Sequence, residues 1–206
     1  MQVIKKTIYQ VEDFNLRFEP VDDDNIIIEK TDKGYDVKYL TYDRYADNPF
    51  DNQDGMGNFY HHSEHGKDEE LKYCEYLGFN IDTHCKIGKE NPLAVKIDKY
   101  EHGGISYSIA GQGMQCQFDT SHSWAVWFPD KCALDEIMTY KTKASQRKRA
   151  LEIAKEACEL LNNWVNGETY CIVKETFDHN KESIDYDTVG GYYGRESAER
   201  ALKTDI

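Results

Sequence analysis

Long apolar runs are missing from this chain of 206 residues. The N-terminal residues Met1-Gln2-Val3-Ile4-Lys5-Lys6 become charged at once, so the hydrophobic stretch of a secretory signal is missing as well. No run approaches the roughly 20 consecutive apolar residues that a membrane-spanning helix needs. These absences predict a protein that acts without a membrane, in the cytoplasm.

Paired cysteines are also missing. The six cysteines stand at positions 74, 85, 116, 132, 158 and 171, and no Cys-x-x-Cys pair occurs among them. Isolated cysteines in a reducing compartment usually act as small buried hydrophobic residues. The cysteine pattern therefore agrees with a reduced, cytoplasmic setting.

Positive charge is scarce. The chain has 25 Lys and Arg residues against 38 Asp and Glu residues, which gives a formal net charge of −13. Such a charge repels the phosphates of nucleic acids and attracts basic partners. We therefore expect a protein partner and no direct nucleic-acid binding. The expected interaction surface is made of Asp22, Asp23, Asp24, Asp47, Asp51 and Asp54.

The densest basic run lies at the start of the longest predicted helix. It consists of Lys141, Lys143, Arg147, Lys148 and Arg149. A helix N-terminus with cations can receive a phosphate group, but no Gly-rich phosphate-binding loop precedes this one. We interpret the run as a solvated basic face of the helix.

The stretch from Asp98 to Phe128 has the clearest strand pattern. Ile105, Tyr107 and Ile109 alternate with polar residues, and Gly103-Gly104 supplies the positive φ angles of a two-residue hairpin turn. Cys116-Gln117-Phe118-Asp119 continues as a further extended segment before the apolar residues 124–128. This stretch is expected to form the middle of an antiparallel sheet.

The remaining pattern predicts an α+β fold. The clearest helix is Ala144–Val165, in which Ala150, Ala154, Ala157 and Leu161 form one apolar row and Asn166-Gly167 marks the end. After it we expect a strand at 170–173, a polar loop at 178–187 and a short strand at 189–193. The prediction is a mostly antiparallel sheet of about six to eight strands, covered by one long amphipathic helix and two or three short ones. We expect a single domain over residues 1–206, with 1–44 as a candidate N-terminal strand-rich subregion.

A histidine-rich loop is the candidate metal site. His61 and His65 would lie on one face if their segment were helical, and together they would be able to bind zinc. Further ligands would come from elsewhere in the chain, with Asp51, Asp54, Cys74, His84 and Cys85 as the candidates. Gly55, Gly57 and Gly66 disfavour a helix here, so the alternative is a solvated polar loop without a cofactor.

A second cluster contains a candidate nucleophile. Cys116 would need a histidine base within hydrogen-bonding distance, and His102 and His122 are the nearest candidates, with Asp119 as an orienting group. No nucleophile elbow or cysteine-hydrolase signature accompanies them. The alternative is that Cys116 is a structural residue of a strand.

Four short motifs carry a family resemblance. They are Asn48-Pro49 with Asp51-Asn52 and Gly55-Met56, leading to His61; Tyr100-Glu101-His102-Gly103-Gly104-Ile105-Ser106; Cys116-Gln117-Phe118-Asp119; and Gly190-Gly191-Tyr192-Tyr193-Gly194. In these motifs the chain resembles a family of uncharacterised proteins from bacteriophages and other bacterial mobile elements. The resemblance implies a biological setting and no mechanism.

These observations lead to one expected function and two alternatives. We expect a phage-encoded, acidic accessory protein that binds a host protein in the bacterial cytoplasm, as an anti-defence or DNA-mimicking inhibitor. The first alternative is a hydrolase that uses the His61 and His65 loop or Cys116 with His102. The second is a structural component of the virion.

Overall fold

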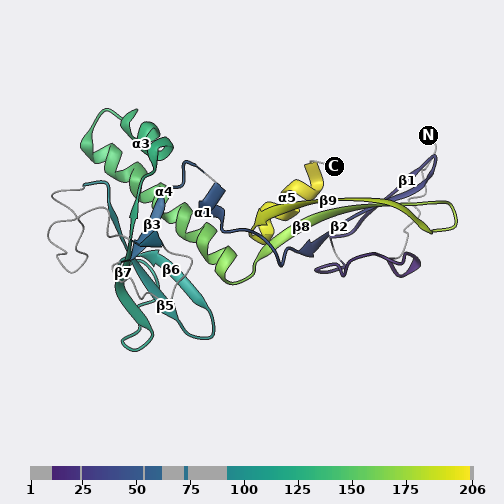
Figure 1. Cartoon of the computed structure of the whole chain (residues 1–206), viewed down its shortest axis with the longest axis horizontal. Coiled ribbons are helices and arrows are strands. Elements are labelled where there is room, and N and C mark those ends of the chain that lie inside the picture. Colours follow the sequence, from purple (N-terminus) through teal and green to yellow (C-terminus); the bar gives the residue numbers. More distant parts are fainter. Residues whose placement is uncertain (1–10, 24, 53, 62–71, 74–91, 205–206) are drawn as a thin grey trace, which may run out of the picture. The chain divides into compact units, whose positions relative to one another are not determined.

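The computed structural model describes residues 11–23, 25–52, 54–61, 72–73 and 92–204 (Figure 1). The fold is α+β, which confirms the predicted class. The chain divides into two compact units. Residues 1–46 and 167–206 form the four-stranded unit, and residues 47–166, inserted between them in the sequence, form the five-stranded unit.

The four-stranded unit is an antiparallel sheet with one helix. Its strands lie in the order β1-β2-β8-β9, so β9 is an edge strand. Its elements are the 3-10 helix Val11–Asp13, β1 Ile27–Thr31, β2 Gly34–Tyr42, β8 Thr169–Phe177, β9 Ser183–Tyr193 and α5 Arg195–Thr204. Strands β2 and β8 pair over eight residues, from Tyr35 opposite Phe177 to Tyr42 opposite Tyr170.

Each face of this sheet carries its own apolar cluster. On one face, α5 buries Ala198 and Leu202 against Leu40, Tyr170 and Ile172. On the other face, Phe14 packs against Val37, Tyr39, Val173 and Phe177. Residues alternate between the two faces along each strand, as the period of two requires. Thr41 of β2 and Cys171 of β8 therefore lie on the Phe14 face, away from α5.

The five-stranded unit combines a second sheet with the long helix. The strand order is β4-β3-β7-β5-β6, and all pairs are antiparallel except β3 with β4. Its elements are α1 Pro49–Asn52, β3 Asn58–His61, β4 Lys72–Tyr73, β5 Val95–Glu101, β6 Ile105–Ile109, β7 Thr120–Phe128, α3 Lys131–Met138 and α4 Lys143–Val165.

Helix α4 confirms the predicted helix almost residue for residue. It begins at a capping box in which Thr142 and Ser145 satisfy each other's backbone N–H groups, and it ends before Gly167, which has a φ of 72°. Its apolar row, including Ala150, Ala154 and Leu161, is fully buried in the main core.

Asn162 of α4 and Asn166, which caps the end of the helix, also bind the backbone of strand β6. The Asn162 side chain accepts from the N–H of Tyr107 at 2.6 Å and donates to its carbonyl at 2.9 Å. Asn166 makes the same pair of hydrogen bonds with Ile105, at 3.2 and 2.7 Å. These amides satisfy backbone groups that an edge strand otherwise leaves to water.

Three expectations need correction in detail. The strands form two sheets where one was expected. Cys116-Gln117-Phe118-Asp119 is a turn, in which the Thr120 N–H bonds to the Cys116 carbonyl at 3.1 Å. The expected polar loop at 178–187 contributes residues 183–187 to β9.

Candidate functional site

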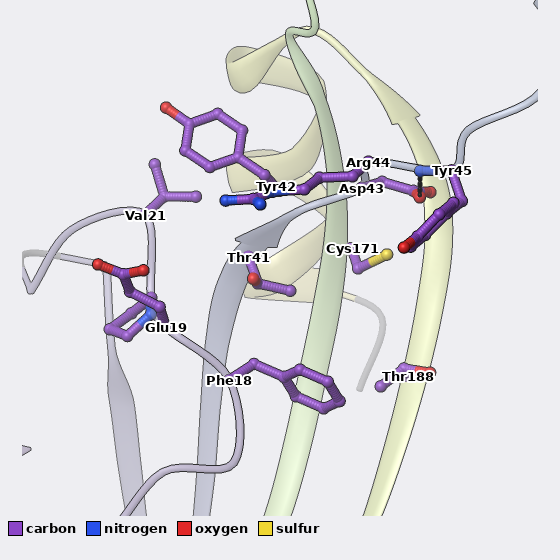
Figure 2. Close-up of a pocket in the computed structure, with 11 residues that line it drawn as sticks. Phe18, Glu19, Val21, Thr41, Tyr42, Asp43, Arg44, Tyr45, Cys171 and Thr188 are labelled. Carbon is purple, nitrogen blue, oxygen red and sulfur yellow. Dashed lines mark hydrogen bonds between the residues drawn. The ribbon is translucent and has the colours of Figure 1, made fainter.

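A pocket of about 530 Å³ lies on the four-stranded unit, on the sheet face opposite α5 (Figure 2). Thr41, Cys171 and Thr188 come from three neighbouring strands and form its floor. Residues 18–21 form one wall and residues 42–45 the other. The pocket therefore belongs to a single unit, and it has the size of a site for a small organic molecule.

A buried carboxylate holds the first wall in place. Glu175 is 1% exposed, and its carboxylate accepts from the Arg17 N–H at 3.0 Å, the Tyr39 hydroxyl at 3.2 Å and the Ser183 hydroxyl at 2.7 Å. The Tyr39 hydroxyl in turn accepts from the Phe18 N–H at 3.2 Å. Burial raises the pKa of Tyr39 to about 12, so the phenol stays protonated and continues to donate.

Asp43 organises the second wall. Its carboxylate accepts from the Tyr45 N–H at 3.2 Å (Figure 2). It also accepts from the Gly191 N–H at 3.2 Å. Gly190 has no room for a side chain, because a Cβ there would stand 2.7 Å from the Asp43 carboxylate and 3.0 Å from the Cys171 sulfur. Burial, together with the charge of Asp43, raises the pKa of Cys171 to about 11. Cys171 is therefore a neutral thiol at physiological pH and a poor nucleophile.

The structure brings the predicted catalytic residues together. The Asp119 carboxylate lies 3.3 Å from the Cys116 sulfur and 3.3 Å from Nδ1 of His102. Asp119 therefore stands between Cys116 and His102. In a catalytic Cys–His–Asp arrangement the imidazole stands between the thiol and the carboxylate. The cluster ties the 116–119 turn to the β5–β6 hairpin, where the Glu101 N–H also bonds to the Asp119 carbonyl at 2.9 Å.

His122, the other candidate base, pairs with a buried aspartate. Its Nδ1 lies 3.4 Å from Asp98, which is 2% exposed and also accepts from the N–H groups of Ser123 at 2.7 Å and Gly111 at 2.9 Å. Burial alone would raise the pKa of Asp98, but these hydrogen bonds outweigh burial and lower it. Asp98 fixes the bulge where β5 pairs with β7, next to Ser123, whose φ is 49°.

The predicted metal site cannot be assembled from the described residues. His61 ends β3, but its side chain lies outside the described set, as does all of His65. Asp51 and Asp54 are exposed. No group of three or more His, Cys, Asp and Glu side chains suited to a metal occurs in the ranges that the structure describes.

The predicted acidic surface is divided between the two units. Asp22 accepts from the Asn25 N–H at 3.0 Å and forms an ion pair with Arg195, so it has a structural role in the four-stranded unit. Asp23 is exposed in the same unit, and Asp24 lies outside the described residues. Asp47, Asp51 and Asp54 are exposed and belong to the five-stranded unit.

A different group of carboxylates gathers on the β8–β9 hairpin. The acidic hairpin residues are Asp178, Glu182, Asp185 and Asp187, and none forms an ion pair with a described residue. The hairpin's two lysines are neutralised from elsewhere: Lys174 binds Asp36 at 3.1 Å, and Lys181 binds Asp13 at 2.9 Å. These four carboxylates thus have no ion-pair partner within the described ranges, although the Arg17 guanidinium lies 4.1 Å from the centre of the Tyr186 ring on the same hairpin.

Two of these aspartates also protect the edge of the sheet. The Tyr186 N–H donates to the Asp185 carboxylate at 2.9 Å, and the Thr188 N–H donates to Asp187 at 2.8 Å. The alternation of Ile184, Tyr186 and Thr188 with the two aspartates is a strand signal in the sequence. The density of charge favoured a loop instead, and these residues were missed.

The basic run at the start of α4 is largely engaged within the fold. Arg147 donates to the carbonyls of Pro92 at 3.1 Å and Ala94 at 2.7 Å. Arg149 binds Glu136, Glu152 and Glu156. These contacts leave the exposed lysines of the run as its solvated part.

Among the described residues, no helix is both long and apolar enough to cross a membrane. Comparisons with protein-family models, curated proteins and solved structures find no match.

Proposed function

We propose that this protein is a phage-encoded, acidic accessory protein that acts by binding a host protein with a basic surface. The observation that carries the proposal is the concentration of carboxylates on the β8–β9 hairpin that form no ion pair with a described residue, within a chain of net charge −13. Four acidic groups in ten residues, with both local lysines neutralised, give one edge of the sheet a negative potential. Complementary charge of this kind sets the rate and the orientation of encounter.

The spacing of the hairpin carboxylates supports competition with DNA. Asp185 and Asp187 lie two residues apart on an extended strand, which separates them by about 7 Å along the strand. Phosphates on one DNA strand rise by roughly 3.4 Å along the helix axis, and the winding of the backbone makes the direct distance between neighbours about twice that, so the two carboxylates match neighbouring phosphates. A protein surface that accepts DNA would therefore meet a similar row of charges here.

Binding is favoured over the hydrolase alternative by the order of the groups around Asp119. The carboxylate separates Cys116 from His102, and His102 is mostly exposed. That arrangement holds a turn, and it places the Asp119 carboxylate next to the thiol where a cysteine hydrolase has an imidazole. Thiol-reactivity measurements on Cys116 test this point, because an activated cysteine would react far faster than the exposed Cys132.

The experiment uses two variants that lose the same charge. Asp185→Asn with Asp187→Asn removes two hairpin charges and keeps an oxygen that accepts the backbone N–H of the next residue. Glu159→Gln with Glu196→Gln removes two exposed charges elsewhere and serves as the matched control. Each immobilised protein is incubated with host lysate at low and high salt, with and without duplex DNA.

We expect the wild-type protein and the control to retain the same basic partner, which high salt and duplex DNA release. The hairpin variant should retain much less of it. Equal retention by the hairpin variant, or the absence of any partner at low ionic strength, would contradict the proposal.

A further inference from the structure

The pocket contains a cation, the guanidinium of Arg44. Arg44 is exposed, and its side chain makes no ion pair or hydrogen bond within the described part of the chain. Figure 2 shows the side chain extending past the ring of Tyr42 toward Val21. Arg44 is a cation in a unit of net negative charge, because the four-stranded unit has 19 Asp and Glu residues against 12 Lys and Arg residues.

The groups around Arg44 are aromatic and hydroxylic. Phe18, Tyr42 and Tyr45 line the pocket, and Tyr45 is 94% exposed. Thr41 and Thr188 supply two hydroxyls from the floor, and neither makes a side-chain hydrogen bond to a described residue. Flat rings suit the stacking of a planar ligand, and free hydroxyls suit its polar substituents.

The carboxylates of the pocket limit the charge that a ligand can carry. Asp43 accepts from two backbone N–H groups and lies beside Cys171, so it is already occupied. Glu19 is exposed at the wall. A ligand with several negative charges would be repelled by both, whereas a single carboxylate would be held by the Arg44 guanidinium in a bidentate contact.

We propose that this pocket binds an aromatic monocarboxylate, with its carboxylate on Arg44 and its ring between Phe18 and Tyr45; the Tyr42 ring is stacked on Tyr170 at 5.4 Å and so is engaged within the fold. This site is separate from the protein-binding function proposed above, because it lies on a face of the sheet and uses other side chains. A volume of about 530 Å³ accommodates a ligand of two fused rings with room for substituents.

Three probes with the same ring system test the charge requirement. They are 2-naphthoate, the neutral 2-naphthamide and the cationic 2-naphthylmethylamine, and binding is measured by titration against the full chain. We expect 2-naphthoate to bind most tightly. In Arg44→Gln its affinity should fall about ten-fold, because a charge-assisted hydrogen-bond pair is lost, while the affinity for 2-naphthamide should not change.

Arg200→Gln is the matched control. Arg200 is exposed on α5, on the other side of the sheet, and its ion pair is with Glu196 at 3.6 Å. The control loses the same charge and should bind 2-naphthoate like the wild-type protein. An equal loss in both variants would mean that only the overall charge matters, which would overturn the proposal.

Alkylation of Cys171 is a second measurement, and it shows whether the ligand binds in this pocket. Cys171 is on the pocket floor and Cys132 is an exposed cysteine of the other unit. Because the pKa of Cys171 is raised to about 11, alkylation by iodoacetamide is measured at alkaline pH, where part of the thiol is ionised; bound 2-naphthoate should slow it at Cys171 and leave Cys132 unaffected. The proposal is overturned if 2-naphthoate does not protect Cys171, if it binds no better than the other two probes, or if no probe binds at millimolar concentration.

Discussion

Individual buried carboxylates organise the backbone of both units. Glu175 fixes the segment that forms one wall of the pocket, and Asp98 fixes the irregular pairing between β5 and β7. Each accepts at least three hydrogen bonds while being almost fully buried. A carboxylate that satisfies several backbone donors stabilises a fold only while it remains ionised.

Asp98→Asn is expected to destabilise the five-stranded unit by about 2 kcal/mol at neutral pH, because an amide offers one oxygen where the carboxylate offers two. The lowered pKa of Asp98 means that the stabilisation is complete above its ordinary value near 3.8 and is lost as the pH falls through the lower folded value. The difference in unfolding free energy between wild-type protein and variant should therefore shrink below about pH 4.

Urea denaturation at several pH values measures this difference. Asp135→Asn, at an exposed position of α3, is the control and should change the stability little at any pH. A difference for Asp98→Asn that stays constant down to pH 2 would show that the charge of Asp98 does not matter.

At the scale of single elements, strand β9 has an edge that is exposed along most of its length. All of its first nine residues are exposed, including Ile184, Tyr186 and Val189. Long, exposed, partly apolar edges attract other strands, and inserted charges are a common protection. Asp185 and Asp187 provide this protection by accepting the N–H groups that a foreign strand would need.

Replacing both aspartates by alanine should therefore increase self-association at concentrations of about 10–100 μM. Analytical ultracentrifugation of the double variant Asp185→Ala with Asp187→Ala measures this self-association. The double asparagine variant loses the same charge but retains the local acceptors, so it should remain like the wild-type protein. If both variants associate equally, the charge and not the backbone hydrogen bond is what protects the edge.

The same elements show what the sequence can predict and what it cannot. Helix α4 and the β5–β6 hairpin follow from local signals, the apolar row ending at Asn166-Gly167 and the glycine pair at 103–104. The predicted two-residue turn is wrong in detail, because Glu101 pairs with Ile105 across a three-residue connection and only the first of the two glycines has a positive φ. The four-stranded sheet depends on the pairing of β2 with β8, which no local pattern reveals.

The two candidate sites also differ in how far the sequence predicts them. Cys116, His102 and Asp119 were predicted as a cluster because they lie close in sequence, although their order around Asp119 required coordinates. The pocket joins residues near 18, 44, 171 and 188. Only the paired strands bring these residues together, so no local pattern in the sequence predicts the pocket.

At the scale of the whole molecule, one unit is inserted into the other. The chain leaves the four-stranded unit after Ala46 and returns at Gly167. The points of departure and return lie side by side in that unit, because Tyr42 pairs with Tyr170 and the Asp43 N–H bonds to the Thr169 carbonyl at 2.8 Å. An insertion of this kind leaves each unit with a core of its own.

The isolated segment 47–166 is therefore expected to fold. Its core contains Trp127, Ile153 and Leu161, each at most 1% exposed, and its longest helix has a complete N-terminal cap. Circular dichroism with urea denaturation should show one cooperative transition with a slope of about 1–3 kcal/mol/M. Leu161→Asp, which buries a charge, is the control that should abolish the transition, and a gradual non-cooperative change in the parent segment would contradict the prediction.

The interrupted pairing of β2 and β8 has a consequence for how the protein is made. Register partners in these strands are 128 to 142 residues apart, from Tyr42 with Tyr170 to Tyr35 with Phe177. At a translation rate of about 5–20 residues per second, β2 waits roughly 6 to 30 seconds on the ribosome before β8 emerges. During that interval β1 is the neighbour strand that β2 has, and the apolar residues of β2 (Val37, Tyr39 and Leu40) are accessible. The nascent chain can then bind chaperones or pair with a wrong strand.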